Sequence, residues 1–273
     1  MKRIVLGISP CPNDTFAFHA LLERRIETPG LELEFELHDI EQLNQRFLAG
    51  RFDACKVSFA VLAGEPRIRV LSSGAALGFG VGPVLIAARG ARLERGADGR
   101  PRIPADARVL SPGLHTSAQL LYRLFHAGEG RVEQAVFSSI LPALAAREAQ
   151  FGVCIHEGRF TYAALGLELV EDLGARWEER EHLPLPLGGI AVREDLAPPF
   201  AAALEDAIAR SIDYARAHSD EALVTMRRHA QEDSDAVLWK HVELYVNEWT
   251  RELGSEGRRA LARLRELASA QLP

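Results

Sequence analysis

The sequence predicts an α/β fold made of two similar lobes, and three observations lead to that prediction. Patterns of short apolar strands and amphipathic helices alternate from the first residues, which is typical of βαβ units and mostly parallel sheets. Residues 40–59 and residues 140–157 repeat the order helix, short turn, strand without repeating the sequence. After residue 192, helical patterns dominate to the end of the chain.

A chain with this order builds one lobe, builds a second, and returns to complete the first. We therefore expect a larger first lobe of residues 1–87 and 193–273, including the C-terminal helices, and a second lobe of residues 88–192. Ligands of such architectures bind between the lobes, at the carboxyl ends of strands. The sequence therefore predicts a ligand cleft there.

The individual elements follow from hydrophobic periodicity and from Pro and Gly breaks. In the first half we expect strands over 3–9, 31–39 and 52–59, helices over 14–25 and 40–50, and a strand, a glycine-rich connection and a second strand within 69–88. In the second half we expect a polar loop over 89–106, strands over 108–112 and 151–155, and a helix over 116–127.

A rigid turn with the sequence SPCPNDTF follows the first strand. Pro10 and Pro12 exclude both a strand ladder and a helix, and Asn13 or Asp14 can cap a helix that begins near Thr15. A helix N-terminus exposes unpaired amides and partial positive charge, which suit a carboxylate or phosphate. We interpret the turn as a device that starts a capped helix at the cleft floor, with its amides aimed at the ligand.

A second strand–turn–helix corner ends in Thr116, Ser117 and Ala118. Their hydroxyls and amides can hold an anion, or Thr116 or Ser117 can simply cap its own helix, and the spacing leaves both interpretations open. Lys56 and Ser58 end another strand opposite the same predicted cleft, where the Lys56 ammonium can meet an acidic ligand.

His156 follows the predicted strand over 151–155, at the end where functional groups gather in α/β folds. An imidazole with an ordinary pKa near 6.5 suits proton removal at neutral pH, although a structural histidine is the alternative. Cys154 shares a strand face with His156, which raises the option of a Cys–His nucleophile pair. The apolar neighbours Val153 and Ile155 instead favour a place for Cys154 in the core.

The composition excludes several classes of protein. The 273 residues are 47% hydrophobic and 26% charged, with a net charge of -6 and no basic block, so no nucleic-acid partner is expected. No apolar run has the roughly 18 residues of a membrane span, and the early prolines interrupt any signal-like segment, so we expect a cytoplasmic protein without a membrane partner. Three widely spaced cysteines argue against a disulfide framework or a zinc knuckle.

Five motifs occur in order along the chain: SPCPNDTF, SGAALGFGVGP, LHTSA, IHEGRFTY and WEEREHLPLPLGGI. As a set they resemble the 1,4-dihydroxy-6-naphthoate synthases, the cyclic dehypoxanthinyl futalosine lyases of the futalosine route to menaquinone. The resemblance extends over nearly the whole chain, from Ile4 to about Asn247. The family has HTTA where this chain has HTSA, which keeps a hydroxyl at that position.

The resemblance implies a two-lobed fold like that of the type II periplasmic binding proteins. It implies a carbon–carbon lyase whose substrate is a small aromatic carboxylate linked to a cyclised ribose, and whose catalytic base is His156. It implies substrate contacts at Lys56, Val57, Ser58, Thr116, Ser117 and Ala118, with Asn44 and Arg159 lining the same cleft. Nothing in the sequence requires a metal or an organic cofactor.

Two other functions fit the same fold. A solute-binding protein would use the cleft without chemistry, and the related chorismate dehydratase of the same pathway would not obviously need a basic His156. The protein is expected to be a monomer or a homodimer. Apolar residues of the helical tail can either form a dimer contact or pack within the first lobe, which we favour: Leu238, Trp239, Val242, Leu244, Tyr245 and Trp249.

Overall fold

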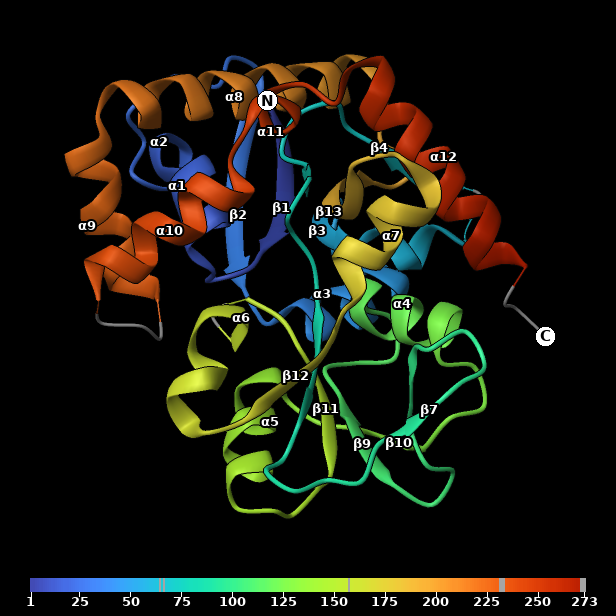
Figure 1. The fold of residues 1–273 in the computed structure, drawn as a ribbon. Helices are drawn as coiled ribbons and strands as arrows, with labels where there is room; N and C mark the ends of the chain where they lie inside the picture. Colours follow the sequence, from blue (N-terminus) through green and yellow to red (C-terminus); the bar gives the residue numbers. More distant parts are fainter. Residues whose placement is uncertain (64, 66, 157, 231–233, 271–273) are drawn as a thin grey trace.

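The computed structural model describes residues 1–63, 65, 67–156, 158–230 and 234–270. Glu157, which belongs to the IHEGRFTY motif, lies outside the described residues. The chain forms a larger lobe, uppermost in Figure 1, and a smaller lobe below it, each built on its own sheet with helices packed around it. The prediction of a two-lobed α/β fold is confirmed.

The sheet of the first lobe begins with parallel strands. β1 (Lys2–Ile8) lies between β2 (Leu31–Leu37) and β3 (Ala54–Ser58), and β13 (Leu185–Val192) pairs antiparallel with β3. The short strands β4 (Arg69–Val70) and β5 (Ala76–Gly78) both pair with β13. The buried side chains of β1 and β13 pack against the long helix α8 (Pro198–Ala217), because the parallel strands are apolar on the face that this helix covers.

The second sheet has the order β10-β9-β11-β6-β12. Its strands are β10 (Arg131–Gln134), β9 (Arg108–Ser111), β11 (Phe151–Cys154), β6 (Val84–Ala87) and β12 (Glu168–Asp172). β9 and β11, which are almost fully buried, match the expected strands. β10 and β12 were not predicted, because both lie at sheet edges and are too polar and exposed to give an apolar run.

Two strands carry the chain between the lobes, and because of them both lobe boundaries differ from those expected. Val84–Ala87 was assigned to the first lobe but pairs with β11 and β12 of the second sheet. Leu185–Val192 was assigned to the second lobe but pairs with β3 of the first sheet. Apolar content alone cannot tell which sheet a fully buried strand joins, so the boundaries could be placed only by strand pairing.

The expectation of mostly parallel sheets is wrong. β1 pairs parallel with β2 and β3, and β9 pairs parallel with β10 and β11. Every pair made by β6 or β13 is antiparallel, because these strands enter each sheet from the other lobe. The expected polar loop over 89–106 also contains a small hairpin of β7 (Glu94–Arg95) and β8 (Pro101–Arg102).

The helices expected over 40–50 and 116–127 are present. α3 (Ile40–Leu48) is capped by the Asp39 carboxylate, which accepts hydrogen bonds from two amides of its first turn. The single helix expected over 14–25 is instead two short ones, α1 (Pro12–Ala17) and α2 (His19–Leu22), separated at Phe18. α4 (Ser117–Phe125), α5 (Phe137–Ala145), α6 (Gly158–Thr161) and α7 (Leu173–Glu181) belong to the middle of the chain.

The C-terminal helices return to the first lobe and cover it (Figure 1). They are α8, α9 (Ser219–His229), α10 (Asp235–Tyr245), α11 (Glu248–Arg251) and α12 (Gly254–Ser269). α10 buries Leu238 and Val242 against Phe16 of α1, and the ring of Trp239 meets Phe16 edge-on at 6.0 Å. The apolar residues of the tail therefore pack within the first lobe, as favoured above.

Candidate active site

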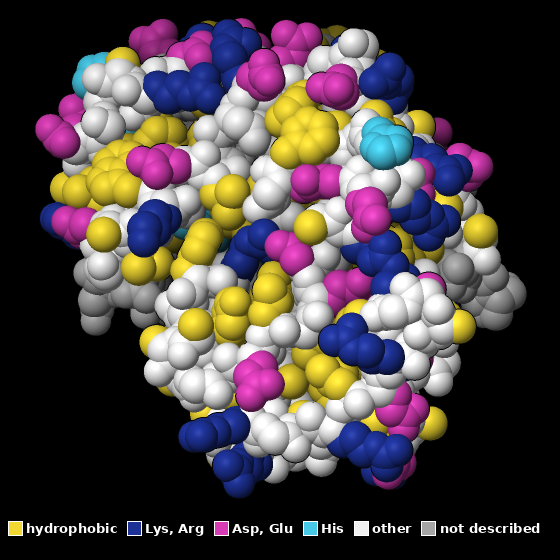
Figure 2. All heavy atoms as spheres, viewed as in Figure 1, with side chains coloured by type: hydrophobic (Ala, Val, Ile, Leu, Met, Phe, Trp, Pro, Cys, Tyr) yellow, Lys and Arg dark blue, Asp and Glu magenta, His cyan; other side chains and the backbone are white. Residues whose placement is uncertain are grey.

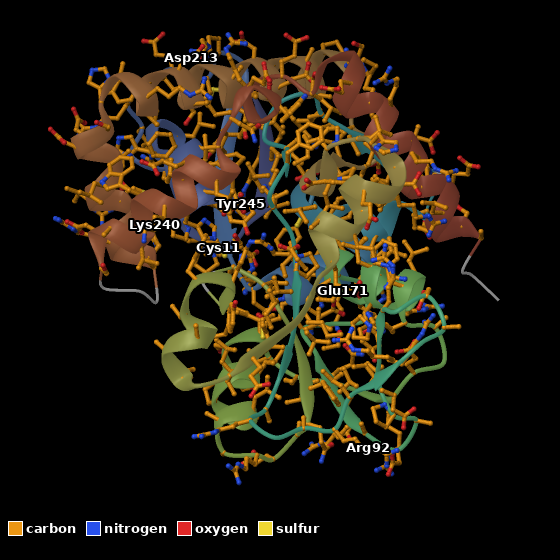
Figure 3. All side chains as sticks on the ribbon, viewed as in Figure 1. Cys11, Arg92, Glu171, Asp213, Lys240 and Tyr245 are labelled. Carbon is orange, nitrogen blue, oxygen red and sulfur yellow. The ribbon has the colours of Figure 1, made fainter. Side chains whose placement is uncertain are left out.

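A pocket lies where the two lobes meet, with an empty volume of about 670 Å³ including its open mouth. The turn after β1, α1, β3, β13 and α10 contribute walls from the first lobe, and α4 and the segment after β11 contribute walls from the second. In Figure 3, Cys11 lies at the lower border of the larger lobe, near this junction, with Tyr245 above it, and Figure 2 shows the narrower second lobe below the first. The predicted cleft between the lobes is confirmed.

A buried ion pair forms the floor of the pocket on the first-lobe side. The Lys56 ammonium donates to Asp14 Oδ1 at 2.8 Å and to the Gly74 carbonyl at 3.1 Å. The hydroxyl of Ser9 and the side-chain amide of Asn13 also donate to Asp14, at 2.7 and 2.9 Å. The lysine charge is thus neutralised inside the protein, so Lys56 does not present an uncompensated charge to an acidic ligand.

The turn SPCPNDTF does not supply the anion-binding helix end that we expected. α1 begins at Pro12 rather than near Thr15, and the amides of Asp14 and Thr15 both donate to the Cys11 carbonyl. The turn instead places Asp14 against Lys56 and brings Cys11 to the opposite lobe.

His156 reaches the pocket from the second lobe. It lies two residues after β11 with φ of 55°, a left-handed conformation that histidine adopts more readily than most residues but that still costs free energy. The ring meets Phe137 edge-on at 5.1 Å, and its two nitrogens lie 3.6 and 3.7 Å from the sulfur of Cys11. A strained backbone that points an imidazole into a cleft is typical of a functional position.

The thiol that accompanies His156 is therefore Cys11, not Cys154. Cys154 is buried among Val84, Ile140 and Leu144 in the second lobe, and burial raises the pKa of its thiol to about 12. A thiol in this environment stays protonated at neutral pH and is not a nucleophile. The interpretation of Cys154 as a core residue is supported by this position.

The N-terminus of α4 lies at the pocket, and Thr116, Ser117 and Ala118 there have different roles. Thr116 caps the helix: its hydroxyl accepts from the Gln119 amide at 3.1 Å and donates to the Gly113 carbonyl at 2.7 Å. The Ser117 hydroxyl donates to the Leu187 carbonyl of β13 at 2.5 Å, which ties α4 to the first sheet. Ser117 and Ala118 line the pocket, and first-turn amides have no acceptor within their own helix. This end of the pocket suits a carboxylate.

Three of the expected contact residues lie behind the pocket. Val57 points away from it into the core beside Leu43 and Phe52, because strand alternation puts Lys56 and Ser58 on the opposite face. Asn44 accepts from the Ser58 amide at 2.9 Å and donates to the His115 carbonyl at 3.1 Å, so it joins the two lobes.

Arg159 also lies in the wall rather than at the pocket surface. Its guanidinium donates to the Gly82 carbonyl at 3.1 Å and to the Asp172 carboxylate at 2.5 Å. Gly82 lies in the connection that enters β6, and Asp172 caps α7. Arg159 thereby holds the crossing between the lobes against the second sheet.

A histidine at the pocket, His241, was not among the site residues predicted from the sequence. His241 of α10 lines the cavity, is 1% exposed, and stacks on His156 with ring centroids 5.9 Å apart. Its position was detectable, since Leu238, His241, Val242 and Tyr245 follow helical spacing along one buried face of α10. A histidine on an otherwise apolar face was the signal.

Among the described residues, no cluster of His, Cys, Asp and Glu is arranged to hold a metal ion. None of the described helices combines the length and apolar character needed to cross a membrane. On the face shown in Figure 2, Lys and Arg side chains are interspersed with Asp and Glu rather than gathered into one patch.

The fold and the interlobe pocket place this chain among proteins built like periplasmic binding proteins. The alkanesulfonate-binding protein SsuA of Xanthomonas axonopodis pv. citri superimposes with a TM-score of 0.71 at 14% identity, covering 99% of this chain and 94% of that one. A Candida albicans protein described as having the generic periplasmic binding protein fold gives 0.68 at 12% identity, covering 100% and 92%. At this level of identity the likeness concerns the fold alone.

Sequence comparison defines the family within that class. Residues 4–270 match the family described as menaquinone biosynthesis, and the chain belongs to it. A 1,4-dihydroxy-6-naphthoate synthase of Thermus thermophilus is 47% identical over 99% of this chain and 96% of its own length. One of Streptomyces coelicolor is 37% identical over 97% and 93%. Protein AF1704 of Archaeoglobus fulgidus, a solved structure, is 31% identical with a TM-score of 0.88, covering 98% and 97%.

Proposed function

We propose that this protein is an enzyme that converts cyclic dehypoxanthinyl futalosine to 1,4-dihydroxy-6-naphthoate in menaquinone biosynthesis, as a carbon–carbon lyase. The observation that carries the proposal is the imidazole of His156, held in a strained backbone at the end of β11 and directed into the interlobe pocket. The names of the relatives at 47% and 37% identity support the product, and the resemblance carried by the five motifs implies the substrate.

In the proposed reaction, His156 acts as the general base. The imidazole removes a carbon-bound proton, and the electrons of that bond drive cleavage of the carbon–carbon bond to the sugar-derived fragment. The resulting imidazolium can return the proton to the departing fragment. Aromatisation of the second ring favours the products, and a positioned base of this kind contributes roughly 10²–10⁴-fold in rate.

Substrate binding is shared between the lobes in this proposal. The amides of Ser117 and Ala118 hold the aryl carboxylate, because a helix N-terminus combines free donors with partial positive charge. Ser58 lines the pocket opposite. The walls of the pocket are held in place by the hydrogen bonds described above, made by Lys56, Thr116, Asn44 and Arg159. Val57 supports the same walls through the apolar core beneath β3.

Turnover by purified protein tests the proposal. We expect wild type to form 1,4-dihydroxy-6-naphthoate, and His156→Asn to lose about 10²–10⁴-fold in kcat. Asparagine tolerates a positive φ, so this change removes the base without the backbone strain that alanine would add. His218→Ala, at an exposed histidine between α8 and α9, is the control and should retain full activity.

Two results would contradict the proposal. If wild type binds the substrate without turnover, the protein is a solute-binding protein in an enzyme's fold. If chorismate is dehydrated instead, the protein is the related dehydratase. Three further expectations have their own tests. Cell fractionation tests the cytoplasmic location, and light scattering tests the monomeric or homodimeric state. Activity assays in the presence of a metal chelator test whether the enzyme works without a metal cofactor.

A further inference from the structure

His241 occupies a place in the pocket that the proposed mechanism leaves unused. It lies on α10, one helical turn before Tyr245, whose ring lies 4.6 Å from its own. On its other side is the ring of His156, nearly parallel at an interplanar angle of 24°. A group bound beside His241 is therefore also beside the proposed base.

Both ring nitrogens of His241 lack a hydrogen-bond partner within the described residues, although the side chain is almost completely buried. Leaving a buried polar atom unpaired is costly, so such atoms in native structures usually have a partner, often a ligand or water. His19 provides a comparison on the same lobe. It is equally buried, but its Nδ1 bonds to the Thr225 hydroxyl at 2.8 Å, and it does not line the pocket.

The charges around His241 indicate which kind of group it can bind. Lys56 and His156 line the same pocket as His241, and burial together with these two groups holds the pKa of His241 well below its ordinary value. The imidazole is therefore neutral at pH 7, with one nitrogen that donates and one that accepts. A hydroxyl group, which also donates and accepts, complements it, whereas a carboxylate is better matched by the amides of α4.

We propose that His241 is a substrate-binding residue that hydrogen-bonds a hydroxyl of the sugar-derived part of the substrate and holds that part beside His156. The inference rests on the proposed function and deepens it. It divides the pocket by chemistry: the α4 amides bind the aryl carboxylate, and His241 binds the portion that is expelled.

The test compares His241→Phe, His241→Gln and wild type for kcat/KM, for the affinities of the substrate and of 1,4-dihydroxy-6-naphthoate, and for Tm without ligand. We expect His241→Phe to lose about 10- to 100-fold in kcat/KM and in substrate affinity, in line with the loss of a buried hydrogen bond. Binding of the product should not change, because it lacks the sugar-derived part. The Tm should be unchanged or higher, because an apolar ring replaces unpaired polar atoms.

The other variants separate binding from structure. His241→Gln keeps a donor and an acceptor and should recover part of the lost kcat/KM. His19→Phe, the matched control, should lower Tm because it breaks the bond to Thr225, and should leave kcat/KM unchanged.

Each result supports or overturns the inference. A His241→Phe variant with full substrate affinity, with equally weakened product binding, or with a strongly lowered Tm would overturn it. Wild type that binds the substrate without turnover would refute the proposed function alone, and the substrate affinity of His241→Phe would still decide the role of His241. Wild type that binds neither substrate nor product would overturn both.

Discussion

At the scale of single residues, the pocket is built around charges that the protein neutralises itself. The Lys56 and Asp14 side chains are 7% and 2% exposed, and they join β3 to α1. Removing one member of a buried pair leaves an uncompensated charge, whereas replacing both with neutral groups is often nearly neutral for stability. The pair therefore holds the pocket floor together as long as both members are present.

We expect Lys56→Met to lower the free energy of unfolding by about 3–5 kcal/mol, because Asp14 stays buried without its partner. The double variant Lys56→Met/Asp14→Asn should recover most of that loss. Urea denaturation of wild type, both single variants and the double variant gives the coupling between the two residues. Losses that simply add would show that the pair is not a coupled unit.

At the scale of elements, the N-terminal cap of α4 determines how this helix presents its first amides to the pocket. The Thr116 cap fixes where the helix starts, and the Ser117 bond to Leu187 fixes that start against β13. By fixing the start of α4, the cap also sets the position of the Ser117 and Ala118 amides at the pocket. The two interpretations left open by the sequence are therefore compatible.

Replacing the cap tests this link. Thr116→Ala should cost about 0.5–2 kcal/mol in urea denaturation, because two hydrogen bonds of the hydroxyl are lost, whereas Thr116→Ser should keep most of the stability. Substrate affinity should fall in the alanine variant and not in the serine variant. Equal stability of the two variants would exclude a capping role.

At the scale of the whole molecule, the second lobe is held by a buried polar cluster rather than by its apolar core alone. His126, at the end of α4, lies 2.9 Å from Glu129 and 2.8 Å from Glu171 of β12. Arg102 of β8 binds Glu129, and Arg176 of α7 binds Glu171, each through one hydrogen bond. Figure 3 shows Glu171 in the upper part of the smaller lobe. The cluster joins four elements of that lobe.

This cluster predicts loss of stability in acid. Burial alone would raise the pKa of Glu171, but hydrogen bonds and charges from His126 and Arg176 hold it below the ordinary value. The pKa of Glu129 is held low in the same way, against burial, by the Ile103 amide, His126 and Arg102.

A depressed pKa stabilises the fold above the unfolded-state value near 4.3, and that contribution is lost as pH falls through the folded-state value. At pH values below about 4.5 the free energy of unfolding should decrease. The decrease should be on the order of 1 kcal/mol for each unit by which the folded-state pKa lies under the unfolded-state pKa. Urea denaturation from pH 7 to pH 3 measures it. Glu171→Gln should flatten the curve and Glu168→Gln, at an exposed position of the same strand, should not. An unchanged slope in Glu171→Gln would contradict this account.

The sequence by itself determined many of the local elements and several of the residues that line the pocket. Periodicity and breaks located β1, β2, α3, β9 and α4, because their apolar faces repeat at the spacing of the structure that they form. The end of β11 marked His156 in the same way. Strand alternation also separates Lys56 and Ser58 from Val57, a signal that was present and unused.

Only the tertiary structure decided which distant groups meet. Cys11 rather than Cys154 contacts His156, and His241 reaches the pocket because α10 returns to the first lobe after the second is complete. The direction of β6 and β13, and hence the lobe boundaries, likewise depends on pairing across the sheets. Local patterns report how much of each segment is buried. They do not report what it is buried against, since contacts between the lobes join residues whose separation along the chain leaves no periodic trace.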